Sequence, residues 1–350
     1  MTKNLKLKIT DLPIICTIAI PVYNRERLIS KAIESAIRQN IENIEILIID
    51  NNSTDKTRNI IKTYKDKRIV FIKNKRNIGL FQNFNECLKK SRGKYIKFLC
   101  SDDMLTDESL KKEIEIMEKN ENLSMLNSVG MRIDHSGHEL GTLGDLFSAG
   151  TYNGNAAILT ALWLQAEYAK NPFNYPSGVL IRGNSARSIC GFDSSFRNAG
   201  DLEFFLRLLT KGDLYVSTNI GCKILVHDQQ EGKFLSNKLI NLLDLYKIYE
   251  IYGKIISSRY NFKNIKYKLN GMVFLMMVSK LVKFDISGIL TLLGPSNNFY
   301  RFSVVNFYFA ILIIYARMKL YFFKEKNNPK GLNYDEIRSY YYYENNKEIL

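Results

Sequence analysis

Four aspartates in this 350-residue chain stand where carboxylates can do chemistry. Asp50 ends one apolar run, the adjacent pair Asp102 and Asp103 follows another, and Asp201 begins a segment with helical spacing. A carboxylate pair on a tight turn can hold a hard divalent cation through oxygen, and such an ion stabilises a departing phosphate. A carboxylate at the start of a helix can act as a general base when it reaches an alcohol.

The same residues also have structural interpretations. Asp102 and Asp103 can cap the helix that follows them, and Asp201 can interact with the dipole of its own helix. Asp50 can hydrogen-bond a base or ribose, or it can accept hydrogen bonds within a turn. His227, one of three histidines, is either a metal or diphosphate ligand or a structural side chain. Spacing alone leaves these alternatives open.

Short apolar runs alternate with helical patterns through the first part of the chain. Strands are predicted at 14–20, 44–49, 69–72 and 95–99, and helices at 28–37, 53–64 and 80–88. This alternation predicts a parallel sheet with helices on both faces. Ligands bind outside the carboxyl ends of the strands in such sheets, so the polar clusters after these strands should open onto one edge. The clusters are Tyr23-Asn24, Asp50-Asn51-Asn52 and Asp102-Asp103.

The chain then continues in the same pattern before it becomes helical and basic. Further strands are predicted at 124–133, 178–182 and 215–226, and helices at 106–120 and 201–210. From about residue 234 the pattern is helical to the end. There is no internal repeat and no low-complexity linker.

The net charge of +15 favours anionic partners: nucleic acid, an anionic membrane face or phosphorylated substrates. Residues 231–350 hold 18 Lys/Arg and 9 Asp/Glu, so 18 − 9 = +9 lies there. The apolar run 304–315 is shorter than the ~20 residues that a membrane-spanning helix needs. We expect either a membrane-apposed helix with basic residues facing anionic lipid or an ordinary packed helix.

Cysteine usage and missing motifs narrow the function classes. The five cysteines form no C-x-x-C pair, which favours a reducing compartment and a cytoplasmic location. Neither G-x-G-x-x-G after the first strand nor a P-loop is present. Dinucleotide oxidoreductases and P-loop nucleotidases therefore lose their main support.

The ordered set of motifs resembles the family 2 glycosyltransferases, which have the GT-A fold. The resemblance covers roughly residues 14–236. It rests on segments 17–24 (TIAIPVYN), 48–55 (IIDNNSTD), 77–79 (NIG), 98–103 (FLCSDD), 191–193 (GFD), 200–203 (GDLE) and 226–227 (VH). Each segment is short, and their order along the chain is what makes the set specific.

This resemblance implies an inverting transfer of a sugar from a nucleotide-sugar donor, with a UDP-sugar favoured, to an acceptor hydroxyl. Asp201 would be the general base, and Asp103 with His227 would hold Mn²⁺ or Mg²⁺. A lipid-linked or cell-surface polysaccharide glycan is the expected acceptor, with peripheral contact at the inner face of the cytoplasmic membrane and no nucleic acid partner. The donor contacts would be Pro21, Tyr23, Asn24, Asp50, Asn77 and Asp102.

The resemblance also implies a domain plan. Residues 1–236 would form the GT-A domain, with a nucleotide-sugar half at about 14–105 and an acceptor half at about 106–236. A helical, basic region would follow at 237–350.

The chain departs from the family pattern at three positions. Asn51 stands where a second aspartate is common, Cys100 where an acidic residue is common, and Gly200 where glutamate commonly precedes the base. A Q-x-x-R-W motif, typical of processive members, is absent, which favours single additions.

Three rival functions remain open from the sequence. A sugar-phosphate nucleotidyltransferase has a related fold but normally carries a Gly-rich, Arg-containing loop where this chain has Pro21-Val22-Tyr23-Asn24. A basic nucleic-acid-binding module would show a steep salt dependence of binding. A non-catalytic glycan-binding relative is disfavoured by the intact Asp102, Asp103 and Asp201.

Overall fold

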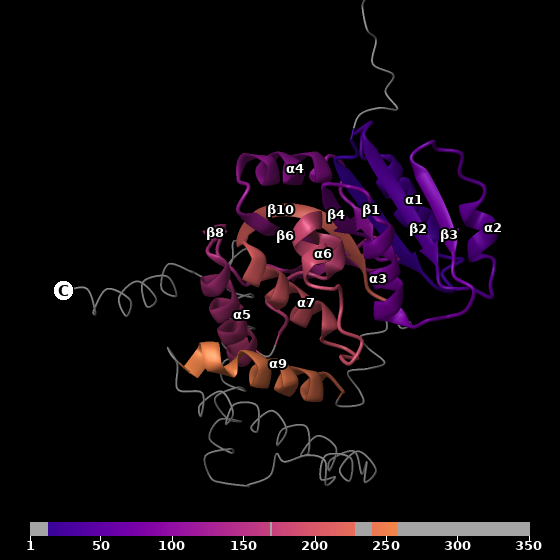
Figure 1. The fold of residues 1–350 in the computed structure, drawn as a ribbon. Helices are drawn as coiled ribbons and strands as arrows, with labels where there is room; N and C mark the ends of the chain where they lie inside the picture. The colour runs from indigo at the N-terminus through magenta and orange to yellow at the C-terminus, as the bar shows by residue number, and fades with distance from the viewer. Residues whose placement is uncertain (1–12, 169, 228–239, 258–350) are drawn as a thin grey trace, which may run out of the picture. The chain divides into compact units, whose positions relative to one another are not determined.

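A computed structural model describes residues 13–168, 170–227 and 240–257 of the chain. Within this part of the chain, the strands form one ten-stranded sheet in the order β3-β2-β1-β4-β9-β6-β10-β5, with β7 paired to β6 and β8 to β10. Helices pack against the sheet (Figure 1). The predicted α/β architecture, with a mostly parallel central sheet, is confirmed.

The amino-terminal half of the sheet is parallel, and its strands β1, β2 and β4 are buried while the edge strand β3 is partly exposed. Its strands are β1 (Cys16–Val22), β2 (Ile44–Asp50), β3 (Ile69–Lys73) and β4 (Tyr95–Phe98). Every residue of β1 and β2 is buried, and β-branched isoleucines suit a strand covered on both faces. Val22 pairs with Asp50 at the last position of the register, so both strands end at the same edge.

Three helices connect these strands: α1 (Ile29–Ile37), α2 (Thr57–Ile61) and α3 (Leu80–Lys90). The apolar residues of α1 recur with helical spacing, and Ile29, Ala32, Ile33 and Ala36 are fully buried. Together with residues of β1, β2 and α4 (Ser109–Lys119) they form the main hydrophobic core. These helices therefore hold the strand ends, and the loops that follow them, in fixed positions.

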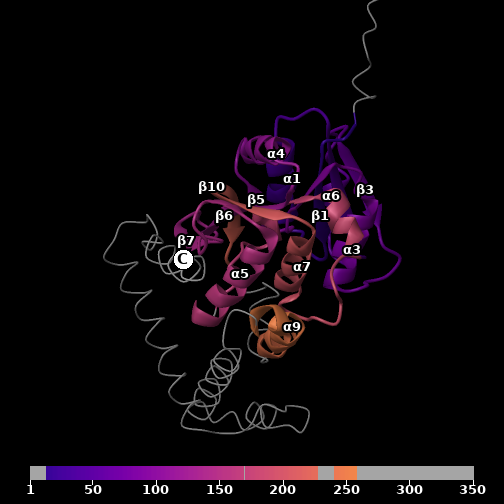
Figure 2. The same ribbon diagram turned by 60° about the vertical axis from the view of Figure 1, so that its left-hand side comes forward.

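The second half of the sheet mixes directions. The strand β9 (Val179–Arg182) is antiparallel to both β4 and β6 (Leu123–Ile133), whereas β10 (Asp213–Leu225) runs parallel to β6. Figure 2 shows β6 and β10 side by side in a second view. Short strands complete this half: β5 (Met104–Leu105), β7 (Glu139–Leu143) and β8 (Gly150–Tyr152).

The remaining elements are helical. They are α5 (Gly154–Tyr168), η2 (Pro176–Gly178), α6 (Gly183–Ser188), α7 (Gly200–Leu208), η3 (Leu209–Lys211) and α9 (Ile240–Ser257). The chain divides into two compact units, of which the first holds the entire sheet. In the second unit, the Tyr249 hydroxyl donates to the Leu162 carbonyl oxygen at 2.7 Å.

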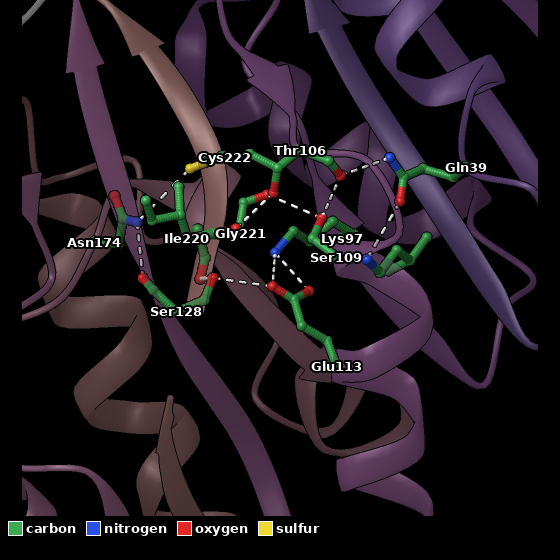
Figure 3. A network of polar contacts seen from close by, with 12 residues as sticks. Gln39, Lys97, Thr106, Ser109, Glu113, Ser128, Asn174, Ile220, Gly221 and Cys222 are labelled. Atoms are coloured by element: carbon green, nitrogen blue, oxygen red, sulfur yellow. Dashed lines mark hydrogen bonds and ion pairs between the residues drawn. The ribbon is translucent and has the colours of Figure 1, made fainter. Parts of the chain in front are cut away.

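A buried ion pair joins β4 to α4 (Figure 3). Lys97 Nζ lies 2.7 Å and 2.9 Å from the two carboxylate oxygens of Glu113, and the Lys97 side chain is 0% exposed. The Ser128 hydroxyl lies 2.9 Å from Glu113 Oε1 and 2.8 Å from the Gly178 carbonyl oxygen. This network ties together β4, which precedes the acidic turn, and Gly178 at the end of η2.

Two expectations fall outside the described residues: the apolar run 304–315 and the domain boundary at residue 236. Among the residues that the structure does describe, no helix is both long enough and apolar enough to span a membrane.

Candidate functional site

The loop after β1 is clamped to the loop after β2. The Asn24 amide donates to Ser53 Oγ at 2.9 Å, and the Thr54 amide donates to Asn24 Oδ1 at 2.8 Å. Asn24 has a φ of 50°, in the left-handed region that asparagine tolerates better than most residues. The residues predicted to contact the sugar-nucleotide donor from these two loops therefore lie together at the sheet edge. The Tyr23 side chain beside them is 39% exposed.

Asp50 is fully buried at the end of β2, and only one of its two carboxylate oxygens accepts hydrogen bonds from the part of the chain that the structure describes. Its Oδ1 accepts from the Ser53 amide at 3.0 Å and from the Ser53 hydroxyl at 2.5 Å. Its Oδ2 has no hydrogen-bond donor among the described residues, and Arg58 Nε lies 3.7 Å away. A buried acceptor without a donor is costly, so this oxygen is suited to receive an N–H from a ligand.

An asparagine network organises the segment between β3 and α3. Asn51 Nδ2 donates to Asn77 Oδ1 at 2.8 Å, and Asn51 Oδ1 accepts from Asn74 Nδ2 and the Ile78 amide, both at 3.0 Å. Asn74 also donates to Asn83 Oδ1 at 2.9 Å. The asparagine at the position of the common aspartate thus connects several loop residues, because an amide both donates and accepts whereas a carboxylate only accepts. Asn77 uses its oxygen to fix the loop.

Asp102 and His227 meet across 125 residues of sequence. His227 Nε2 lies 2.9 Å from Asp102 Oδ2, and Arg25 Nε lies 3.9 Å from the same oxygen. The His227 ring is almost fully buried, and its centroid is 6.3 Å from that of His135. The acidic turn after β4 and the end of β10 therefore share one site.

Asp103 faces the protein interior. Its Oδ2 accepts from Ser177 Oγ at 2.6 Å, and its Oδ1 accepts from the Leu225 amide at 3.3 Å. Burial raises the pKa of Asp103 well above its usual range, and the adjacent Asp102 charge raises it further. The sequence prediction pairs Asp103 with His227 in the metal site, whereas in the structure it is Asp102 that contacts the histidine.

A divalent cation suits Asp102 and His227 by the chemistry of their donor atoms. Carboxylate oxygen and imidazole nitrogen both bind Mn²⁺-like ions, and Mg²⁺ commonly uses one or two carboxylates with substrate phosphates. The described residues contain no group of three or more His, Cys, Asp or Glu side chains that could hold a metal. Phosphate and water oxygens would therefore have to complete the coordination.

Asp201 occupies the first turn of α7, where its Oδ1 accepts from the Leu202 amide at 2.7 Å. Tyr175, in the segment before η2, is 41% exposed and feels the charges of both acidic turns. Burial raises the pKa of the Tyr175 hydroxyl, and the negative charges of Asp201 and Asp103 add to this effect, while Arg132 opposes it. The charges of Asp201 and Asp103 therefore both influence the Tyr175 hydroxyl.

Sequence reasoning missed several of the residues that build this edge. Ser177, Tyr175, Arg25 and His135 carry no motif of their own. Only contacts between distant segments reveal them. A separate cavity of about 150 Å³ lies beside the start of α4, lined in part by Lys112, Glu113 and Ser217, and it contains none of the predicted site residues.

Comparison with known proteins bears on the family and the fold of the chain. Residues 17–177 match the family described as Glycosyl transferase family 2. An uncharacterized glycosyltransferase of Methanocaldococcus jannaschii is 35% identical over 133 residues, which is 37% of this chain and 46% of the relative. The Escherichia coli protein WfaP, named UDP-Glc:alpha-D-GlcNAc-diphosphoundecaprenol beta-1,3-glucosyltransferase, is 42% identical over 102 residues, or 29% of this chain and 41% of WfaP. The chain thus spans less than half the length of these two relatives.

Among solved structures, Staphylococcus aureus TarS in complex with UDP-GlcNAc superposes with a TM-score of 0.57 at 16% identity. The superposition covers 87% of this chain and 89% of the TarS chain. At that identity the likeness shows the fold alone. Residues 17–177 thus match glycosyl transferase family 2, and the chain shares its fold with TarS.

Proposed function

We propose that this protein is an inverting glycosyltransferase that moves a sugar from a UDP-sugar to an acceptor hydroxyl. The observation that carries the proposal is that the acidic turn after β4 and the acidic start of α7 both influence Tyr175 by charge. Asp201 and Asp103 both act on Tyr175, and Asp102, next to Asp103, contacts His227. These observations support a cation-binding group at Asp102 and His227 and a base at Asp201 within one site.

The proposal for a uridine donor is supported by Asp50. Its buried Oδ2 lacks a donor, and the N3–H of uracil is a donor that cytosine does not have. The proteins to which the chain is similar point the same way, since TarS was solved with UDP-GlcNAc and WfaP is named for UDP-Glc. Tyr23 and Asn24, in the loop clamped to the loop after β2, are then placed to contact the nucleotide, with Pro21 at the end of β1 beside them.

Mn²⁺ or Mg²⁺ would be held by Asp102 and His227 together with the diphosphate. When bound, such an ion offsets the negative charge that develops on the leaving group. Asp103 would not contact the ion. Its hydrogen bonds with Ser177 and the Leu225 amide would instead hold in place the turn that carries Asp102. This assignment moves the metal-ligand role from Asp103, where sequence reasoning put it, to Asp102.

Asp201 is proposed to accept the proton of the acceptor alcohol. The acceptor oxygen forms a bond to the anomeric carbon as the bond from that carbon to the diphosphate oxygen breaks, and UDP departs with the electron pair. The proton moves to the Asp201 carboxylate, and the anomeric configuration inverts in this single displacement. General-base catalysis of this kind contributes ~10²–10⁴-fold to the rate.

A lipid-linked or cell-surface glycan acceptor is proposed on two grounds. WfaP is named for an acceptor on diphosphoundecaprenol, and residues 231–350 of this chain carry the +9 excess, 18 − 9, that suits an anionic surface. Peripheral contact with the inner face of the membrane follows from the same two observations.

The test is UDP release from a panel of UDP-sugars, measured with and without Mn²⁺. We expect one donor to be turned over in a Mn²⁺-dependent manner, and Asp201→Asn to lower kcat by about 10² or more without loss of UDP affinity. Near-normal turnover by Asp201→Asn would remove the base assignment. Consumption of nucleoside triphosphate with a sugar phosphate would instead show a nucleotidyltransferase.

A further inference from the structure

Phe81, in the first turn of α3, packs directly onto Gly200, in the first turn of α7. A Cβ placed on Gly200 would lie 2.5 Å from Phe81 Cζ and 2.7 Å from its Cε2. Real Cβ atoms do not approach ring carbons so closely, so the ring occupies the space that any side chain at residue 200 would need. This is the position where the family commonly has a glutamate.

The Phe81 ring is itself held by a stack of aromatic side chains. It lies 5.6 Å from the Phe192 ring at an interplanar angle of 12°, and Phe192 lies 4.0 Å from the Phe204 ring at the same angle. Phe204 belongs to α7, the same helix that begins at Gly200. The Asn85 side chain of α3 binds both backbone groups of Phe192. Its Nδ2 donates to the Phe192 carbonyl oxygen at 2.8 Å, and its Oδ1 accepts from the Phe192 amide at 2.7 Å.

The start of α3 is tied to the proposed nucleotide site. The Gly79 amide donates to Asn77 Oδ1 at 2.9 Å, and Asn51 Nδ2 lies 3.2 Å from the Gly79 carbonyl oxygen. One turn further, Asn83 Nδ2 donates to the Ile49 carbonyl oxygen of β2 at 3.1 Å. A continuous set of contacts therefore runs from the strand end that carries Asp50 to Phe81.

We propose that the contact between Phe81 and Gly200 positions Asp201, so that the base is held in register with the nucleotide loop. Phe81 and Gly200 are positioning residues, and neither touches the reacting atoms. Asp201 follows Gly200 directly in α7, so a displacement of the first turn moves its carboxylate. The inference rests on the proposed function, because it assigns a task to the base named there.

The test is a double-mutant cycle with Gly200→Ala, Phe81→Ala and the two combined. In the wild-type background, the added methyl collides with the ring, shifts the first turn of α7 and lowers kcat for UDP release by roughly 10²-fold. In the Phe81→Ala background the methyl has room, so Gly200→Ala changes kcat by less than about twofold. The affinity for UDP, measured by titration calorimetry, stays unchanged in all three variants.

Phe71→Ala is the matched control. Phe71 is also a half-buried phenylalanine, but it lies on the outermost strand β3 and packs against the main core. Its truncation lowers the free energy of unfolding while leaving kcat unchanged. A kcat loss in Phe71→Ala as large as in Gly200→Ala would assign the effect to stability and overturn the proposal. An equal cost of Gly200→Ala in both backgrounds would overturn it too.

A second measurement tests the positioning contact even if the proposed function is wrong. If the wild-type protein releases UDP from no UDP-sugar, amide hydrogen exchange of residues 200–203 replaces kcat in the same cycle. Faster exchange on Gly200→Ala in the wild-type background alone supports the positioning contact. Unchanged exchange in every variant overturns it.

Discussion

A single buried oxygen, Asp50 Oδ2, is the residue-scale observation behind the proposed uridine donor. Asp50 Oδ2 is enclosed at the end of β2, and the protein supplies hydrogen-bond donors only to the other oxygen of the same carboxylate. Proteins leave few buried polar atoms unpaired, and those that remain commonly serve a ligand. The proposed preference for uracil therefore rests on this one residue, Asp50.

Asp50→Asn is expected to weaken UDP binding about tenfold, the loss that follows when one buried hydrogen bond of roughly 1.4 kcal/mol is removed. The new amide can donate to N3 of cytosine, so the ratio of UDP to CDP affinity should fall further than the UDP affinity alone. Titration calorimetry with both nucleotides measures this ratio. An unchanged ratio would show that Asp50 does not contact the base.

The elements that frame the site are held by polar contacts across the sheet as well as by apolar packing. The ion pair between β4 and α4 is among the most enclosed of these contacts, with side chains 0% and 5% exposed at Lys97 and Glu113. Ser128 brings β6 into the same network and also contacts the Gly178 carbonyl. The acidic turn and the η2 segment, whose Ser177 holds Asp103, thus extend from one anchored point.

Lys97→Met is expected to lower the free energy of unfolding by about 3–5 kcal/mol, because Glu113 is left buried without a partner. Adding Glu113→Leu should restore most of this loss, since no buried charge remains. Lys94→Met is the control: its partner Glu118 is exposed, and the change should stay under about 1 kcal/mol. Urea unfolding measures all three, and equal effects of the two lysine substitutions would contradict the expectation.

At the scale of the whole molecule, charge is the dominant feature. The chain carries +15 overall, a value that draws it to anionic surfaces through long-range attraction. A lipid-linked acceptor would place the protein at such a surface. The attraction is sensitive to salt, because exposed charges are screened beyond a few ångströms at high ionic strength.

We therefore expect the full-length protein to sediment with vesicles that contain phosphatidylserine at low salt and to be released at about 0.5 M salt. Vesicles of phosphatidylcholine alone are the control and should leave it in the supernatant. Equal binding to both vesicle types would show that charge does not drive the association.

Local pattern was enough to predict the alternating strands and helices and the polar turns at their ends. Isoleucine-rich runs such as 44–50 read as buried strands because apolar periodicity is a property of neighbouring residues. Asp50, Asp102, Asp103 and Asp201 were found in the same way, as polar residues directly after strands or at a helix start. The family resemblance, carried by these turns in order, is confirmed by the match over 17–177.

Only the tertiary structure decided which partners these residues take. Asp102 and Asp103 are adjacent and chemically identical, yet one contacts His227, 125 residues away, and the other contacts Ser177 and the Leu225 amide. Likewise, the residues near Gly200 in the sequence do not predict that the Phe81 ring packs against it. Local periodicity determines which face a side chain takes, but its partner depends on how strands distant in the chain are brought side by side in the sheet.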